Sequence, residues 1–138
     1  MIRQTIDVKG YWKGVVYWNV DYPLFYVIEE EMREMGISEE NIEEIYEMMS
    51  SGKAKAVTFS DTKNHISIVL FNRHKRKEDY INSIVHEAEH VKQAMLEAYQ
   101  VEDKGEPPAY TIGYLVSRMW NVFKDLVCKI CNYTRQDV

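Results

Sequence analysis

Apolar residues recur every three or four positions from 79 to 101, and this spacing predicts a long helix. The pentapeptide His86-Glu87-Ala88-Glu89-His90 lies inside this run. On a helix with about 3.6 residues per turn, His86 and His90 lie about 40° apart around the axis, so both imidazoles project from one face. Two imidazoles so placed suit a zinc ion, and Glu87, about 100° further round, suits a base acting on a metal-bound water. The segment therefore predicts a metal site built on a helix.

Strand-like patterns predict the β part of the fold. Residues 2–20 are rich in β-branched and aromatic types, with the best strand over 14–20, and apolar residues alternate in 53–60 and 65–71. Turn-forming residues at 61–64 join the last two segments into a hairpin. Since two strands alone are marginal, we expect the hairpin to pair with the strands before Tyr22. The expectation is an α+β fold with a small mixed or antiparallel sheet packed against the 79–101 helix and further helices.

Two shorter helices are predicted between the strand regions. The first begins near Asp21 and Pro23 and ends at Gly36. The second begins at Ser38, a good capping residue, and ends near Ser50. Its outer face is acidic, and we interpret these glutamates as a solvated surface.

Composition limits the class of protein. A chain of 138 residues with 46% hydrophobic content predicts a single domain over 1–138. The net charge of −5 and pI near 5.4 argue against a nucleic-acid partner. Residues 1–7 show no signal-peptide pattern and no apolar run could span a bilayer, so we expect a cytoplasmic protein with no membrane partner. Cys128 and Cys131 are expected to be reduced core residues.

The remaining basic and histidine residues are less informative. Residues 72–77 form the one dense basic run, which is either a solvated connection or a positive rim favouring acidic partners. His65 and His74 are expected to be surface or turn histidines and not ligands.

A catalytic zinc usually has three protein ligands, so one more ligand is expected. The downstream candidates are Glu97, Glu102, Asp103 and Glu106. Glu97 lies two turns further along the same helix, and Glu102 and Asp103 fall where that helix ends. Glu106 opens a second long helix predicted over 107–131 and is the best placed.

Two tyrosines follow Glu106 on the second helix. Tyr110, one turn on, shares its face, and Tyr114 follows one turn later. Either tyrosine could donate a hydrogen bond to a developing oxyanion, or could simply pack between helices.

This order of elements resembles the zincin metallopeptidases, in particular their glutamate-zincin branch. It is also similar to small zincin-like proteins of phages and mobile elements in gut bacteria. The likeness rests on a hairpin before residues 82–87, and on Glu106-Pro107-Pro108-Ala109-Tyr110-Thr111-Ile112-Gly113 as an E-x-x-[GA]-Y-x-x-G pattern. It covers residues 50–114, although Pro107 and Pro108 depart from the expected pattern.

The resemblance implies a zinc-dependent peptidase. His86, His90 and Glu106 would hold Zn²⁺, Glu87 would be the general base, and Tyr110 is the catalytic candidate for oxyanion binding. The substrate would be a peptide or protein, paired with the strand over 66–70 as a sheet edge. The alternative is a non-catalytic zincin-like protein that binds a partner protein. The sequence indicates no oligomeric state.

Overall fold

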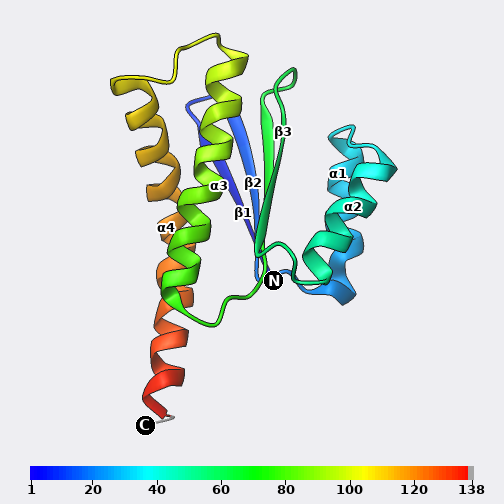
Figure 1. Cartoon of the computed structure of the whole chain (residues 1–138), viewed down its shortest axis with the longest axis vertical. Coiled ribbons are helices and arrows are strands. Elements are labelled where there is room, and N and C mark those ends of the chain that lie inside the picture. The colour runs from blue at the N-terminus through cyan, green and yellow to red at the C-terminus, as the bar shows by residue number, and fades with distance from the viewer. Residues whose placement is uncertain (137–138) are drawn as a thin grey trace. The chain divides into compact units, whose positions relative to one another are not determined.

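The computed structural model describes the backbone of residues 1–136 and the side chains of residues 1–126. It confirms the α+β class (Figure 1). The chain divides into two compact units, Met1–Arg73 and His74–Val138, and each is described by itself. The single domain expected over residues 1–138 stays a prediction.

The first unit contains a four-stranded mixed sheet. Its strands are β1 (Ile2–Val8), β2 (Trp12–Trp18), β3 (Ala56–Asp61) and β4 (Ile66–Phe71), in the order β1-β2-β4-β3. Only β2 and β4 run parallel, and the other two pairs are antiparallel. The predicted hairpin is β3–β4, and in its turn the Asp61 carboxylate accepts hydrogen bonds from the amides of Lys63 and Asn64 at 3.0 Å.

The strand order corrects one expectation about the sheet edge. β4 pairs with β2 on one side and with β3 on the other, so residues 66–70 have no free edge for a peptide. The edge strands are β1 and β3. The error arose because the return of the chain beside β2 is a long-range pairing that local alternation does not encode.

Two helical segments follow β2. The short η1 (Tyr22–Leu24) leads directly into α1 (Phe25–Glu34), and α2 (Glu39–Ser50) comes next. The predicted cap is confirmed, because the Ser38 hydroxyl accepts from the Asn41 amide at 3.2 Å. Gly36 ends the first helix with φ +84°, a left-handed value that glycine adopts at low cost.

One face of the sheet and these two helices form the core of the first unit. Alternate residues of β2 and β4 point to this side and pack with the apolar stripes of α1 and α2. The buried members are Val15, Tyr17, Val20, Phe25, Ile28, Met32, Ile37, Ile42, Ile45, Met49, Ile68 and Leu70. The predicted helix cover of the sheet is therefore observed on this face.

The opposite face of the sheet carries buried aromatic side chains whose contacts lie within the sheet. The Trp12 indole donates to the Ser67 hydroxyl at 3.0 Å, and the Trp18 ring stacks on Phe71 with centroids 4.5 Å apart. Trp12, Trp18, Ser67 and Phe71 are all buried, so this face is not a solvated one.

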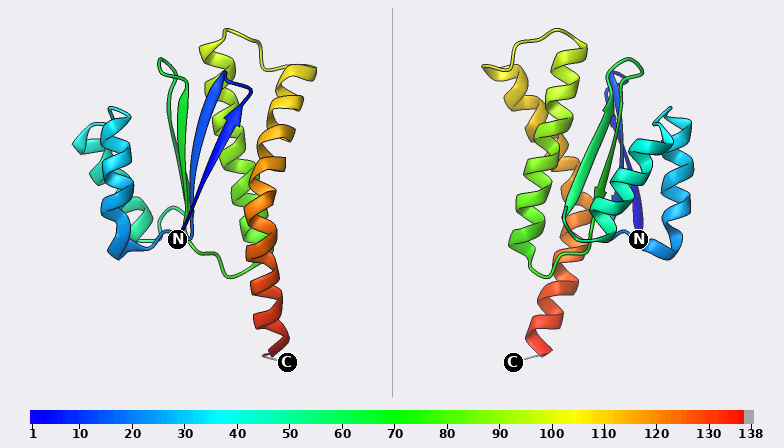
Figure 2. Two further views of the ribbon diagram at one scale, coloured as in Figure 1. Left: turned by 180° about the vertical axis from the view of Figure 1, so that it is seen from behind. Right: turned by 45° about the vertical axis from the view of Figure 1, so that its right-hand side comes forward.

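The second unit is an antiparallel helical hairpin of α3 (Lys77–Ala98) and α4 (Glu106–Gln136), side by side in both views (Figures 1 and 2). Tyr80 packs near Phe123, with ring centroids 5.9 Å apart. Cys128 and Cys131 lie outside the described side chains. Among the described residues, no helix is long and apolar enough to cross a membrane.

The buried face of α3 matches only part of the stripe of apolar residues that recur over 79–101. Ile84, Ala88, Val91, Met95 and Leu96 are buried, but Ile81, Val85 and Tyr99 are exposed. Ser83, Glu87 and Lys92 are buried instead. The predicted stripe was wider than one packing face, because residues at both three- and four-residue spacings were counted around the helix.

Candidate metal centre

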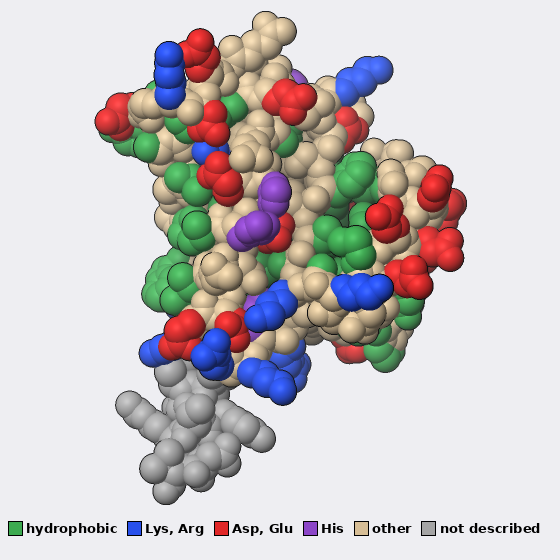
Figure 3. Space-filling model, in the orientation of Figure 1, with side chains coloured by type: hydrophobic (Ala, Val, Ile, Leu, Met, Phe, Trp, Pro, Cys, Tyr) green, Lys and Arg blue, Asp and Glu red, His purple; other side chains and the backbone are tan. Residues whose placement is uncertain are grey.

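His86 and His90 stand on successive turns of α3, and both are exposed. Their Nε2 atoms are 3.2 Å apart, and the rings meet edge to face with centroids at 4.8 Å and an interplanar angle of 73°. Histidine side chains, in purple, are visible at the surface over the α3 region (Figure 3). The helical register alone brings the two nitrogens together, as their four-residue spacing predicted.

This nitrogen separation fits a zinc ion. Zn–N bonds of about 2.0–2.1 Å at a tetrahedral angle place two ligand nitrogens about 3.3–3.4 Å apart. The observed 3.2 Å corresponds to an N–Zn–N angle of about 100–105° with the same bond lengths. The separation of the two nitrogens is therefore compatible with one shared metal ion, and it is also that of a hydrogen bond from one imidazole to the other.

Glu87 follows His86 but lies on a different face of α3. Glu87 is 4% exposed, whereas His86 is exposed to solvent. Ser83, one turn earlier, is buried beside it on the helix surface. A buried carboxylate is costly unless it is bonded, and Glu87 does have interaction partners. Its role as general base stays a prediction.

Glu106 is the first residue of α4, at an exposed helix start, as predicted. Pro107 and Pro108 are compatible with this position because the amides of a first helical turn need no partner within the helix. Within the described residues, no three or more His, Cys, Asp or Glu side chains are grouped to hold a metal. The structure brings His86 and His90 together, and Glu106 as the third ligand stays a prediction.

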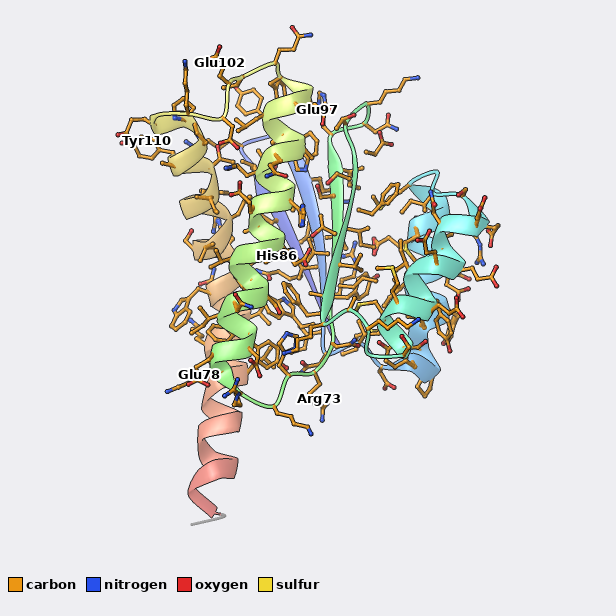
Figure 4. The ribbon with its side chains drawn as sticks, in the orientation of Figure 1. Arg73, Glu78, His86, Glu97, Glu102 and Tyr110 are labelled. Atoms are coloured by element: carbon orange, nitrogen blue, oxygen red, sulfur yellow. The ribbon has the colours of Figure 1, made fainter. Side chains whose placement is uncertain are left out.

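The other downstream carboxylates are engaged elsewhere or distant. Glu102 pairs with Lys104 at 2.9 Å, and Asp103 pairs with Lys92 at 2.9 Å. Glu97 lies further along α3 than His86 (Figure 4).

The two tyrosines of α4 differ in environment. Tyr110 is 74% exposed at the loop end of α4, well away from the labelled His86 (Figure 4). Tyr114 is half-buried, and its hydroxyl accepts a hydrogen bond from Arg118 at 3.1 Å. An oxyanion role for either tyrosine stays a prediction.

One histidine expectation is wrong. His74 is buried, stacks on Tyr80 with ring centroids 4.4 Å apart, and shares a hydrogen bond of 2.7 Å with the Ser83 hydroxyl. No local sequence pattern signals its partner Ser83, nine residues further along the chain. His65 does lie in a turn, against Trp12, as expected.

Lys92 is a buried charged residue of α3 that sequence reasoning missed. It is buried on α3 between two carboxylates. The available signal was its phase, since Lys92 follows the buried Ala88 by four positions and so falls on the packing side of the helix.

Comparisons with protein-family models, curated proteins and solved structures return no match to this chain. The zincin likeness therefore rests on the motifs in the chain itself.

Proposed function

We propose that this protein is a zinc-dependent hydrolase that cleaves peptide bonds, acting in the cytoplasm. The observation that carries the proposal is the 3.2 Å separation of the His86 and His90 Nε2 atoms, which suits two ligands of one zinc ion. His86, His90 and Glu106 would hold the metal. Glu87, the residue next to His86 in the sequence, is one that a purely structural metal site does not need.

Each residue then has a defined chemical role. When bound, zinc would act as a Lewis acid and lower the pKa of a water molecule bound to it. Glu87 takes the proton of the attacking water and passes it to the leaving amine. His86 and His90 would donate their nitrogen lone pairs to the metal.

The first test is zinc binding by the metal-free protein, measured by competition with a chromophoric chelator. We expect about one zinc per chain. His86→Ala and His90→Ala should each weaken binding by more than the about 10- to 100-fold typical of losing a residue that only supports a ligand. His65→Asn is a matched control, because it removes an imidazole at a position with φ +58° that asparagine tolerates. Equal zinc affinity in His86→Ala, His90→Ala and His65→Asn would exclude a zinc site at His86 and His90.

The second test separates an enzyme from a metal-binding protein. Glu87→Gln should keep zinc but lower hydrolysis of a quenched fluorescent peptide library by about 100-fold or more. Cleavage at the wild-type rate in Glu87→Gln would refute the proposed mechanism.

A second candidate function is binding of a partner protein without catalysis. It is favoured by exposed apolar side chains on the helical hairpin, namely Ile81 and Val85 of α3 and Trp120 of α4. Zinc binding without hydrolysis of any library peptide, together with loss of a partner upon Val85→Asp, would support this function instead.

A further inference from the structure

A hollow of about 350 Å³ lies in the first unit, where the chain leaves β2 and β4. Its wall is made by residues 19–23, which follow β2, together with Met1 and Arg73. All of these residues belong to the first unit. Small-molecule sites in proteins measure about 300–1,000 Å³, so a hollow of this volume suits a small ligand.

The hollow lies where the geometry of a sheet favours ligand binding. β2 and β4 are neighbouring parallel strands, so their carboxyl ends meet at one end of the sheet. In open α/β sheets, ligands bind just outside the carboxyl ends of the strands, where the chain turns away and leaves polar groups accessible. The Val20 amide donates to the Phe71 carbonyl at 3.0 Å, which holds the two connections side by side beyond the paired strands.

Hydrogen bonds fix the wall of the hollow at Tyr22. The Tyr22 hydroxyl donates to Asn72 Oδ1. Asn72 Nδ2 in turn donates to the carbonyl of Met49 at 2.9 Å and to that of Ala54 at 3.1 Å. This part of the wall is therefore ordered before a ligand arrives, which lowers the entropic cost of binding.

Two opposite charges line the hollow, Asp21 after β2 and Arg73 after β4 (Figure 4). Both residues are exposed, and in the part of the chain that the structure describes neither side chain forms an ion pair. A guanidinium binds a carboxylate through two parallel hydrogen bonds, and a carboxylate accepts hydrogen bonds from an ammonium. Met1, Val20 and Pro23 add apolar surface to the same wall.

We propose that this hollow binds a free amino acid, with Arg73 holding its carboxylate and Asp21 holding its ammonium. An amino acid carries both charges on one carbon atom, so it can engage both residues from within one small site. The apolar part of the wall favours an apolar side chain on the ligand. This site is separate from the proposed zinc site and does not depend on it.

The first test is a titration of the full chain, followed by the amide chemical shifts in NMR spectra. The probes are L-leucine and, in parallel, L-methionine and L-phenylalanine. At least one of them should shift the amides of residues 19–22 and of Arg73 in a saturable manner. If none of the three shifts these amides, the proposal is overturned.

Fragments of leucine then test which charges are recognised. Isoamylamine is leucine without its carboxylate, and isocaproate is leucine without its ammonium. Each should bind about 10-fold or more weakly than leucine, because each lacks one charged hydrogen-bonding group. Binding of either fragment as tightly as leucine would show that only one charge is recognised, and would overturn the proposal.

Two substitutions assign the charges to residues. Arg73→Gln should weaken leucine binding by about 10-fold or more and leave isoamylamine binding unchanged, because isoamylamine has no carboxylate. Asp21→Asn should likewise weaken leucine and leave isocaproate unchanged. Arg76→Gln is the matched control, because Arg76 stands in the same basic run but is 70% exposed and pairs with Asp79. An effect of Arg73→Gln that is equal for leucine and isoamylamine, or equal to that of Arg76→Gln, would contradict the assignment.

Inorganic phosphate distinguishes an amino acid site from a general anion site. A guanidinium alone binds phosphate as well as carboxylate, whereas the Asp21 carboxylate repels phosphate. Phosphate should therefore bind more weakly than leucine to the wild type, and more tightly to Asp21→Asn than to the wild type. Phosphate binding tighter than leucine binding in the wild type would overturn the proposal.

Discussion

Removal of the Glu31 carboxylate should destabilise the first unit more than any other single surface charge change near it. Glu31, on α1, accepts hydrogen bonds from the Arg3 guanidinium at 3.1 and 2.6 Å and from the Tyr17 hydroxyl. These contacts tie α1 to β1 and β2. Tyr17 is buried, whereas the Arg3 side chain is 43% exposed and can be hydrated when its partner is lost.

Arg3 and Tyr17, the two hydrogen-bond partners of Glu31, contribute unequal amounts to the free energy of unfolding. An exposed ion pair such as Arg3–Glu31 is worth about 0.2–1 kcal/mol. A hydroxyl left without its partner in a buried position costs about 1–3 kcal/mol. Glu31→Ala should therefore lower the free energy of unfolding by about 2–3 kcal/mol. Glu29→Ala is the control, because its i,i+4 pair with Arg33 is exposed and worth about 0.3–0.5 kcal/mol, and Arg33 keeps its bond to Glu39.

The contacts of Glu31 also predict two pH ranges in which the stability of the first unit changes. Burial raises the pKa of Glu31, but hydrogen bonds from Arg3 and Tyr17 outweigh it, so the pKa falls below its usual 4.5. This stabilisation is present above pH 4.5 and is lost as the pH falls through the lowered pKa. Burial, followed by the bond to Glu31, raises the pKa of Tyr17 from 10.0 to about 12, so that stabilisation is present below pH 10 and lost as the pH rises toward 12.

Urea denaturation at several pH values, followed by tryptophan fluorescence, measures these effects. The difference in unfolding free energy between wild type and Glu31→Ala should be largest between about pH 5 and 9 and should shrink at both extremes. The reasoning would be refuted if Glu31→Ala lost no more unfolding free energy than Glu29→Ala. It would also be refuted if the difference in unfolding free energy between wild type and Glu31→Ala did not change with pH.

Four further substitutions test local features of the helices by the same denaturation assay. Ser38→Ala should cost about 1 kcal/mol by removing the cap of α2, whereas Ser51→Ala, at the other end of that helix, should cost less than about 0.5 kcal/mol. Gly36→Ala should cost about 1–2 kcal/mol through its φ of +84° alone, since no atom lies within 4 Å of an added Cβ. Gly113→Ala, in open space on α4, should instead stabilise by about 0.5–1 kcal/mol, and the same sign at both glycines would contradict the backbone argument.

Features that depend on neighbouring residues were predictable from the sequence. The Ser38 cap, the stop at Gly36 and the β3–β4 turn each depend on a few consecutive residues whose side chains or backbone conformations decide the structure. The convergence of His86 and His90 belongs to the same class, because a helix fixes residues four positions apart.

Features that depend on distant segments were not predictable in this way. The pairing of β4 with β2 decides which strands form the edges, and the burial of His74 depends on Ser83 and Tyr80, which the chain reaches only after α3 begins. Exposure of Ile81 and Val85 likewise depends on where the second helix packs, which periodicity within α3 does not specify.

The proposed zinc site depends both on neighbouring residues, His86 and His90, and on a distant one, Glu106. This difference predicts how strongly the loss of each ligand weakens zinc binding. Zinc binding to His86 and His90 uses a spacing that is already present in α3, so it requires little reorganisation. Addition of Glu106 requires the loop between the two helices to take one particular path, and the cost of ordering that path is subtracted from the binding free energy. Loss of either histidine should therefore weaken zinc binding more than loss of Glu106.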